Sequence, residues 1–392
     1  MRLLYVADGR SPIALAWLEH FAAGGHEVHL VSTRPCAPRI DLASLSIVSI
    51  GPGSGQRTGA APSRSRRRLA LLTALRHWVG PLAVRRAAPV LERRIEEVRP
   101  DLVHALRIPF EGMLAAAARP KAPLLISVWG NDFTLHAPST PLMRSSTRRA
   151  LACADALHAD CRRDVRLAAA WGLRGGRPTL TLPGNGGVRR EVFRPMDVAR
   201  PEKRQPLPGW TAAAGLVLNP RGLRAYMRTD TFFRAAPRVL GQAPDTDFAA
   251  VGMVGDPEVL AWVESLGLGS RTRLLPAQDA AGMAALFRAA HVSVSPSVHD
   301  GTPNTLLEAM ACGCVPVAGD LESIREWIVD GENGLLVDAT SPEDLAQAIV
   351  RALKDEGWRT WAARRNLEII SERADYEQGM RRAEAFYREL AG

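Results

Sequence analysis

Residues 2–32 read RLLYVADGRSPIALAWLEHFAAGGHEVHLVS and contain two short apolar runs with a helix-like stretch between them. The first run, residues 2–7, breaks at Asp8-Gly9, and the helix-like stretch ends at Gly24-Gly25 before a second apolar run at residues 28–32. A strand, a glycine turn, a helix, a glycine stop and a second strand form a βαβ unit, in which the two strands lie parallel in one sheet. The sequence therefore predicts an α/β fold.

This alternation continues through the first half of the chain and restarts in the second half. Further strand-like runs stand at residues 46–50, 101–106, 124–129, 156–160, 179–184, 216–220, 248–255, 273–277, 292–297, 315–320 and 334–338. A proline-rich stretch without periodicity separates the two series. The sequence predicts two Rossmann-like, doubly wound parallel-sheet domains: an N-terminal domain over 1–195, a linker over 196–210 and a C-terminal domain over 211–374. A ligand is expected in a cleft between the carboxyl ends of the two sheets.

Length and composition are those of an ordinary globular protein. The 392 residues fit two domains of roughly 100–200 residues each. Charged residues make up 23% and the mean hydropathy is −0.07, values that exclude disordered and fibrous classes. No apolar run approaches the ~18 residues of a membrane span, and the N-terminus has no secretory signal layout. The five cysteines include no Cys-x-x-Cys pair, so we expect a reduced, cytoplasmic protein.

The positive charge of the chain is carried by arginine. Lys and Arg total 50 and only three are lysines, which leaves 47 arginines. No lysine follows a glycine-rich loop, so a Walker-type phosphate site is excluded. The segment 57–99 holds 11 arginines and three glutamates, a balance of +8, and alternates basic and apolar residues at helical spacing. It is expected to be a solvated helix face, to lie on an anionic membrane, or to face a charged acceptor. Nucleic acid is not an expected partner, because no stacking aromatics accompany the arginines.

The candidate chemistry lies in residues 293–320, which read SVSPSVHDGTPNTLLEAMACGCVPVAGD. A strand-like run ends before a loop that carries Asp300 and Gly301. The pattern then predicts a helix with Thr302 as its N-cap and Pro303 as its first residue, which is where serine or threonine caps and proline are favoured.

The start of this helix suits a phosphate, because the first backbone N–H groups of a helix have no partner within it. Asn304 and Thr305 carry such groups, and Glu308 lies on the same helix face one turn later. Asp300 before the helix and Glu308 inside it would bracket an anionic ligand rich in hydroxyls, such as a sugar nucleotide. On spacing alone the alternative is a turn-capping Asp300 and a solvated Glu308.

This stretch resembles the signature of the retaining GT-B glycosyltransferases of glycosyltransferase family 4. Asp300 and Glu308 stand at its two acidic positions, and LLEAMACGCVPVAGD (306–320) and DGENGLLVD (330–338) carry the closest likeness. GGHEVHLVS, DLVHAL and LPGNGGVRREVFRP extend the resemblance over most of the chain. It implies the GT-B architecture, with a final helix at about 375–392 that packs back onto the first domain.

The resemblance also implies roles for individual residues. Glu308 would bind the ribose hydroxyls of the nucleotide, and Asp300 would bind hydroxyls of the donor sugar. Arg221 would bind the diphosphate, and Arg228, with Arg224 behind it, would replace a lysine that is absent here. The remaining candidate donor-site residues are Gly301, Thr302, Pro303, Asn304, Thr305 and Leu275.

The chain departs from the family at two positions where histidines are frequent, which are Leu106 and Trp129 here. Its first loop also departs, because it reads DGRSP and lacks the usual Gly-Gly pair. No histidine that contacts the donor sugar can therefore be carried over. For His104, a satisfied core histidine is the alternative to a site residue. The residues expected to face the acceptor are Gly9, Arg10, Ser11, His104, Arg107, Glu111, Asn131 and Asp132.

We therefore expect a retaining glycosyltransferase that moves a hexose-type sugar from a UDP- or GDP-linked donor to a hydroxyl of a membrane glycolipid, a polysaccharide or a small metabolite. We expect no metal or cofactor, and we interpret Asp245-x-Asp247 as a turn. The protein would be cytoplasmic or peripheral on the inner face of the membrane. A sugar-nucleotide epimerase or hydrolase, and a non-catalytic sugar-nucleotide-binding protein, are open alternatives.

Overall fold

Two compact units make up the chain. The computed structural model describes residues 1–50, 66–205, 207, 210 and 215–392. Unit 1 consists of Met1–Gly186 and Gln378–Gly392, and unit 2 consists of Gly187–Glu377. The C-terminal residues therefore belong to the N-terminal unit.

The passage from unit 1 to unit 2 differs from the predicted linker. Val188 and Phe193 are buried in the core of unit 2, so the chain enters that unit before residue 195. Arg204, within the predicted linker, is also tied to unit 2, because its guanidinium donates to the carbonyls of Ala290 (2.9 Å) and Gly313 (2.8 Å). Proline content and missing periodicity indicated a linker here, but these long-range contacts cannot be deduced from local sequence.

Seven parallel strands form the sheet of unit 1, in the order β3-β2-β1-β4-β5-β6-β7. They are β1 (Arg2–Ala7), β2 (Glu27–Ser32), β3 (Ser44–Ile47), β4 (Leu102–Ala105), β5 (Leu124–Val128), β6 (Ala156–Ala159) and β7 (Thr179–Thr181). Tyr5 of β1 pairs with His104 of β4 in the register of the two central strands. The direction of winding reverses between β1 and β4, which is where ligands bind in open α/β sheets.

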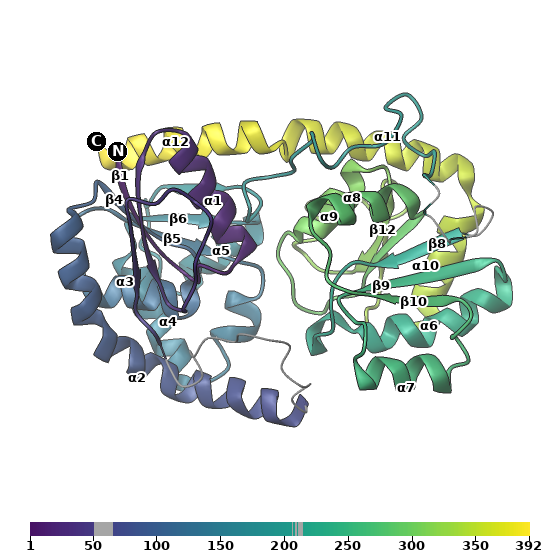
Figure 1. Ribbon diagram of the computed structural model, residues 1–392, viewed down its shortest axis with the longest axis horizontal. Coiled ribbons are helices and arrows are strands. Elements are labelled where there is room, and N and C mark those ends of the chain that lie inside the picture. Colours follow the sequence, from purple (N-terminus) through teal and green to yellow (C-terminus); the bar gives the residue numbers. More distant parts are fainter. Residues whose placement is uncertain (51–65, 206, 208–209, 211–214) are drawn as a thin grey trace. The chain divides into compact units, whose positions relative to one another are not determined.

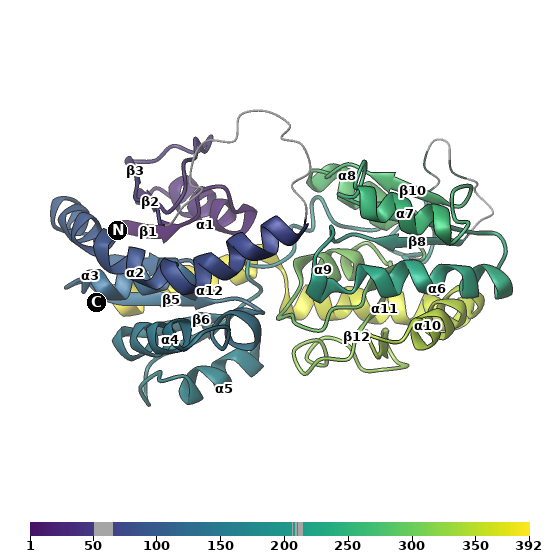
Figure 2. The same cartoon turned by 90° about the horizontal axis from the view of Figure 1, so that it is seen from below.

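Helices cover both faces of this sheet. They are α1 (Pro12–Ala23), α2 (Arg66–Val98), α3 (Met113–Ala118), α4 (Pro141–Cys153), α5 (Arg162–Ala170) and α12 (Tyr376–Ala391). The rings of Phe21 and Tyr387 stack 4.4 Å apart, which places α12 beside α1, on the face opposite α3 and α4 (Figure 1). Residues 66–98 of the basic segment form one helix of 33 residues, α2, with Pro81 and Pro89 inside it; α2 packs against α3 (Figure 2). Residues 57–65 of the segment lie outside the described residues.

Six parallel strands form the sheet of unit 2, in the order β10-β9-β8-β11-β12-β13. They are β8 (Gly215–Asn219), β9 (Thr246–Val251), β10 (Thr272–Leu275), β11 (Val292–Ser295), β12 (Val315–Gly319) and β13 (Leu335–Val337). Here the winding reverses between β8 and β11. The helices are α6 (Thr229–Gln242), α7 (Pro257–Ser265), α8 (Ala280–Ala289), α9 (Asn304–Ala311), α10 (Pro342–Lys354) and α11 (Glu356–Arg373). Figure 1 shows α8, α9 and α11 on one face and α6, α7 and α10 on the other.

The interpretation of Asp245-x-Asp247 as a turn is right for Asp245, which lies in a turn, and wrong for Asp247. Asp247 does not lie in a turn: β9 begins at Thr246, and Asp247 is a buried strand residue. Arg271 accounts for its burial, since the guanidinium lies 3.5 Å from Asp247 and 3.7 Å from the exposed Asp245. Among the helices that the structure describes, none combines the length and the apolar character that a membrane span requires.

Candidate functional site

The candidate donor site lies in unit 2, at the carboxyl ends of the two strands where the winding reverses. Arg221 follows β8, and Asp300 follows β11. The Arg221 guanidinium forms an ion pair with the Asp300 carboxylate and lies 3.4 Å from Ser295 Oγ. Both side chains are largely shielded from solvent, with exposed fractions of 15% and 11%. The two residues that the resemblance assigns to the donor therefore meet at one point.

The backbone of Asp300 is held as firmly as its side chain. Ser323 Oγ donates to the Asp300 carbonyl (2.8 Å), and the backbone N–H of Gly301 donates to the Asp300 carboxylate (3.2 Å). Buried Ser323 had no signal in the sequence, because it acts through the chain fold and not through a motif.

The predicted cap of the following helix is wrong by one residue. Pro303, not Thr302, is the N-cap of α9, and no side chain caps that end. Thr302 Oγ1 instead accepts a hydrogen bond from Trp327 Nε1 (2.9 Å), and both residues are buried. Since no described side chain caps α9, its first N–H groups can bind another acceptor.

The first turn of α9 carries polar groups without partners. Asn304 Oδ1 and Thr305 Oγ1 are shielded from solvent and have no hydrogen-bond partner in the described chain. Glu308 follows on the same helix face, and burial raises the pKa of its carboxyl to about 7. Buried polar groups are normally paired, so the two unpartnered groups of Asn304 and Thr305, on the same face as Glu308, mark a surface shaped for a polar ligand.

The other donor-site candidates form hydrogen bonds with residues other than Asp300. Arg228 begins α6 with a left-handed backbone, and its guanidinium binds both carboxylate oxygens of Asp230 at 3.0 Å. Arg224 is exposed and donates to the Tyr226 hydroxyl (2.9 Å). Leu275 ends β10, and its carbonyl accepts from the backbone N–H of Gly252 (2.8 Å). Arg221 is therefore the arginine that the structure joins to the Asp300 carboxylate.

Unit 1 collects the acceptor-side candidates at the corresponding edge of its own sheet. Gly9 follows β1, and its backbone N–H donates to Ser32 Oγ (3.1 Å). Arg10 pairs with Asp8 (2.8 Å). Ser11 caps α1, although its bond to the Ala14 N–H is long at 3.5 Å. These residues form the turn between β1 and α1.

The loops after β4 and β5 meet at a second ion pair. Arg107 Nε lies 3.0 Å from the fully buried Asp132 carboxylate, and its Nη2 lies 3.2 Å from Asn131 Oδ1. Glu111 is buried and accepts a hydrogen bond from Thr33 Oγ1 (2.5 Å). Burial raises the pKa of both Asp132 and Glu111.

His104 is placed apart from this polar edge. It is 1% exposed, and its two ring nitrogens are bonded to Tyr387 Oη and, at 2.7 Å, to Ser127 Oγ. The structure therefore favours the satisfied core histidine over the acceptor-side role.

A buried acidic pair lies next to the loop that carries Asn131 and was not singled out from the sequence. Asp160 accepts from the Gly130 N–H (3.1 Å), and Arg163 donates to the Gly130 carbonyl (2.7 Å). Ligand atoms of Asp160, Cys161 and Asp164 lie within 4.8 Å of one another, and Arg163 pairs with Asp164 at 2.8 Å. The Arg163 guanidinium thus supplies positive charge to the buried acidic pair, and the Asp160 carboxylate and the Arg163 guanidinium together hold the backbone of Gly130.

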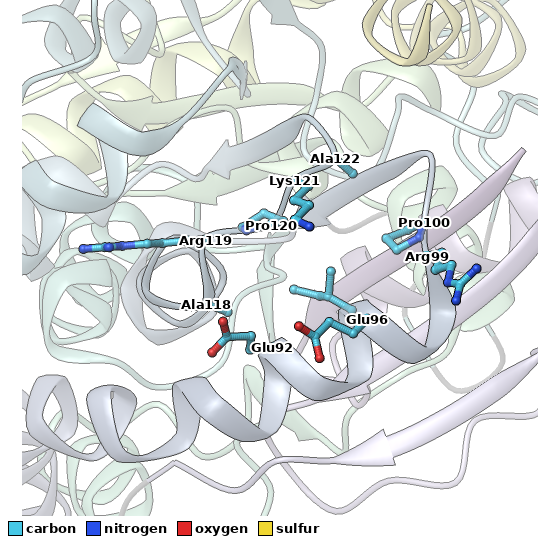
Figure 3. A pocket seen from close by; sticks show the side chains of 10 residues that line it. Glu92, Glu96, Arg99, Pro100, Ala118, Arg119, Pro120, Lys121 and Ala122 are labelled. Atoms are coloured by element: carbon cyan, nitrogen blue, oxygen red, sulfur yellow. The ribbon is translucent and has the colours of Figure 1, made fainter.

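A hollow of about 490 Å³ lies at the opposite edge of the unit 1 sheet, before β4 and β5 begin. Figure 3 shows Glu92 and Glu96 of α2 beside it, with Lys121 across from them and Arg119 extending away. Because open α/β sheets bind ligands at their carboxyl ends, this hollow does not belong to the candidate site.

Two family models match the chain, one in each half. The first, described as a glycosyl transferase 4-like domain, matches residues 9–184, and the second, glycosyl transferases group 1, matches residues 219–355. The chain belongs to the group 1 glycosyltransferases. The matches include the loop after β1 as well as the segment with Arg221, Asp300 and Glu308.

Curated relatives of this group 1 glycosyltransferase are similar over about half of the chain. The D-inositol 3-phosphate glycosyltransferase of Streptosporangium roseum is 29% identical over 197 residues, which are 48% of this chain and 45% of the relative. The enzyme of the same name from Acidothermus cellulolyticus is 32% identical over 197 residues, covering 48% and 43%. The chain thus matches less than half the length of these relatives.

Solved structures extend the likeness over the whole chain. Sucrose-phosphate synthase from Thermosynechococcus elongatus has a TM-score of 0.75 at 18% identity, covering 100% of this chain and 99% of that one. Anabaena HepE in complex with UDP has a TM-score of 0.72 at 17% identity, covering 98% and 99%. At such identities the likeness shows the fold alone, and it confirms the expected two-domain GT-B fold.

Proposed function

We propose that this group 1 glycosyltransferase transfers a hexose-type sugar, with retention of configuration, from a nucleoside diphosphate sugar to an acceptor hydroxyl. The observation that carries the proposal is the cluster at the β8–β11 switch point of unit 2. There Arg221, which is paired with Asp300, lies after the end of β8, and polar groups without partners among the described residues line the first turn of α9, the helix after β11. A ligand with a diphosphate and several hydroxyls satisfies all of these groups.

In this proposal each group has one task. Glu308 accepts hydrogen bonds from the ribose hydroxyls, and Asp300 accepts them from the donor sugar. The free N–H groups of Asn304 and Thr305 bind the diphosphate, as helix N-termini bind anions generally. Arg221 adds a fixed positive charge beside Asp300, and Arg228, which is likewise ion-paired with an aspartate, Asp230, is the second cation.

The chemical step needs mainly electrostatic assistance. The bond between the sugar C1 and the diphosphate oxygen breaks, a bond from C1 to the acceptor oxygen forms, and the acceptor proton passes to the leaving diphosphate. Negative charge grows on that diphosphate, where Arg221 and the start of α9 stabilise it. No side-chain base is then required, in keeping with Leu106 and Trp129 at the positions where the family often has histidines.

Two comparisons support UDP as the nucleotide. Solved structures of Anabaena HepE hold UDP and UDP-glucose. The relatives named D-inositol 3-phosphate glycosyltransferases support a hydroxyl of a small polyol as one acceptor class, beside the membrane glycolipid and the polysaccharide. We expect transfer without a metal ion, so a chelator should leave the rate unchanged.

A thermal-shift screen of UDP-, GDP- and ADP-linked sugars tests donor binding. A donor at a hundred times its dissociation constant adds about 2.7 kcal/mol of stability. The product made from the selected donor is then examined by NMR, in which an anomeric configuration equal to that of the donor supports retention. Release of free sugar without any acceptor product would favour a hydrolase, and binding without turnover on any acceptor class would favour a non-catalytic binding protein.

We also propose that unit 1 lies on an anionic membrane through helix α2. Four large apolar residues on one face of α2 are exposed: Leu75 (45%), Trp78 (57%), Val79 (39%) and Leu82 (47%). Their spacing of three and four residues aligns them along the helix. The helix has no acidic residue from position 66 to 91, which suits a negatively charged surface.

A hollow of about 380 Å³ beside this face supports the same partner. Pro81 and Arg85 of α2 line it with Arg119 and Arg149, and its other lining residues include no acidic group. In sedimentation with phosphatidylglycerol vesicles we expect Trp78→Ala to weaken binding severalfold. Trp361→Ala, which removes a tryptophan of similar exposure (49%) in unit 2, should not. Equal binding to neutral phosphatidylcholine vesicles, or no effect of Trp78→Ala, would overturn the membrane proposal.

A further inference from the structure

Arg76 of α2 is a partly buried cation without a hydrogen-bond acceptor. Its Nε is shielded from solvent and has no partner among the residues that the structure describes. The guanidinium carbon lies 4.1 Å from the centroid of the Phe110 ring, so the cation rests on an aromatic face. An arginine presents five N–H donors, and a buried one is normally satisfied by a carboxylate or a carbonyl.

The ring beneath Arg76 is held in an uncommon conformation. Phe110 has φ +72° and Arg107 has φ +116°, so two non-glycine residues with positive φ stand in one short loop after β4. Gly80 of α2 makes room for the ring, because a Cβ at that position would collide with Phe110. Backbone strain of this kind persists where the surrounding structure enforces it, and it gathers at ligand sites.

Arg76 lies where three loops at the switch point of unit 1 converge. Burial lowers the pKa of Arg76 to about 10. Charged residues on the loops after β1, β2 and β4 also act on this pKa: the two arginines among them lower it and the two acidic residues raise it. These charges belong to Asp8, Arg34, Arg107 and Glu111. The carboxyl ends of β1, β2 and β4 are neighbours in the sheet, so the cation stands at the edge where the acceptor candidates gather.

The acidic groups near Arg76 already have partners. Asp8 is bound by Arg10 at 2.8 Å, and Asp132 is bound by Arg107 at 3.0 Å. Glu111 accepts from Thr33, and burial raises the pKa of its carboxyl. Among the residues that the structure describes, the positive charge of Arg76 is therefore poorly compensated, and a partly buried, poorly compensated charge is destabilising unless an anion binds.

We infer that Arg76, resting on Phe110, binds an oxyanion carried by the acceptor, a phosphate or carboxylate group, at the carboxyl ends of β1 and β4. An arginine fork matches the geometry of either group. That the acceptor carries this anion rests on the function proposed above, whereas binding of an anion by unit 1 does not. A charged acceptor is one of the partners that the sequence predicts for the segment 57–99, and Arg76 is the residue of that segment that would bind it.

The test measures anion binding directly, without a sugar donor. Inorganic phosphate and acetate are titrated calorimetrically into the full chain carrying Arg221→Gln, which removes the guanidinium proposed to bind phosphate in unit 2. Adding Arg76→Gln should weaken binding by about tenfold or more, the loss of a hydrogen bond to a charged group. Adding Arg148→Gln is the matched control, since Arg148 also lies over an aromatic ring of unit 1, that of Trp171, and it should change the affinity less than about twofold.

The preferred anion identifies its source: tighter phosphate binding indicates a phosphate ester, and tighter acetate binding indicates a carboxylate. Absence of binding for both anions, or equal affinity with and without Arg76→Gln, overturns the inference. A failed sugar-nucleotide screen would not affect this titration, so the two proposals can fail separately.

Thermal unfolding separates an anion-binding arginine from a structural one. Because Arg76 is poorly compensated by the described residues, adding Arg76→Gln to the Arg221→Gln chain should leave the melting temperature unchanged or raise it, and phosphate should stabilise the chain that retains Arg76 more than the chain that lacks it. A structural role would instead lower the melting temperature of Arg76→Gln whether or not phosphate is present, and that result would contradict the inference.

Discussion

The hydroxyl oxygens of Tyr5 and Tyr387 lie 3.2 Å apart inside unit 1, although 382 positions separate the two residues in the chain. Tyr5 comes from the first strand and Tyr387 from the last helix, and both are fully buried. The Tyr387 hydroxyl also bonds to Nδ1 of His104. This contact joins the two ends of the chain in one core.

A chain of hydrogen bonds continues from Tyr387 across the sheet to the carbonyl of Leu182. His158 Nε2 lies 3.2 Å from the carbonyl oxygen of Leu182, which can only accept, so this nitrogen carries the proton. His158 Nδ1 then accepts from Ser127 Oγ (2.8 Å), Ser127 accepts from His104 Nε2 (2.7 Å), and His104 Nδ1 accepts from the Tyr387 hydroxyl. Burial lowers the pKa of both histidines, so both rings are neutral and this set of bonds gives each of them one tautomer.

Removing the Tyr387 hydroxyl should destabilise unit 1. Tyr387→Phe leaves His104 Nδ1 buried without a donor, which costs about 1–3 kcal/mol. Urea unfolding measures the loss. Tyr226→Phe removes a hydroxyl that accepts from Arg224 near the surface, and it should cost less than about 0.5 kcal/mol. Equal effects of the two variants would contradict the buried network.

Acid should destabilise the fold through the same histidines. Burial lowers the pKa of His158 to about 4 and that of His104 well below its usual value. Between about pH 6.5 and 4, these histidines are therefore protonated in the unfolded chain but stay neutral in the folded chain. The free energy of unfolding consequently falls as the pH drops below about 6.5 and continues to fall towards about 4. Urea titrations across this range should give a shallower pH dependence for His158→Gln. An unchanged slope would mean that His158 is protonated in the fold.

Donor affinity should rise with pH if Glu308 binds the ribose as a carboxylate. Its pKa of about 7 means that the carboxyl is mostly neutral at lower pH. The affinity for a nucleotide sugar, whose diphosphate does not titrate in this range, should be roughly tenfold weaker at about pH 6 than at pH 8. Glu308→Gln should bind weakly at both values. Glu264→Gln, an exposed change on α7, serves as the control and should keep the pH dependence.

Replacing Arg221 should slow transfer more than it weakens donor binding, because the charge that it stabilises grows during the reaction. We expect Arg221→Ala to lower the turnover number by about a hundred- to a thousandfold, or ~2.7–4 kcal/mol. Arg238→Ala, which removes an exposed partner of Glu343, should leave the rate within twofold, or about 0.4 kcal/mol. A loss confined to the Michaelis constant would assign Arg221 to ground-state binding.

The α/β fold could be predicted because its signals are local. The apolar run 2–7, the turn Asp8-Gly9 and the stop Gly24-Gly25 correspond to β1, the loop after it and the end of α1. The segment 293–320 likewise places Asp300 before α9 and Glu308 within it. Periodicity and glycine positions determine such elements without knowledge of the remaining chain.

The features that were missed depend on contacts between distant residues. Thr302 had the right type and position for an N-cap, but Trp327, 25 positions later, takes its hydroxyl. The sequence favours a turn at Asp247 because its ion-pair partner Arg271, 24 positions later, cannot be inferred from spacing. The cation–π pair of Arg76 and Phe110 is hidden for the same reason.

The contact between Tyr387 and the first strand has a consequence for biosynthesis. Unit 1 includes residues 1–186, yet its core lacks α12 until residues 376–391 have been translated. Unit 2, whose last residue is Glu377, is complete before that moment. The half that is made first must therefore finish folding last, and a nonsense mutation that deletes only the final helix would release a chain with an intact second unit and an unfinished first one.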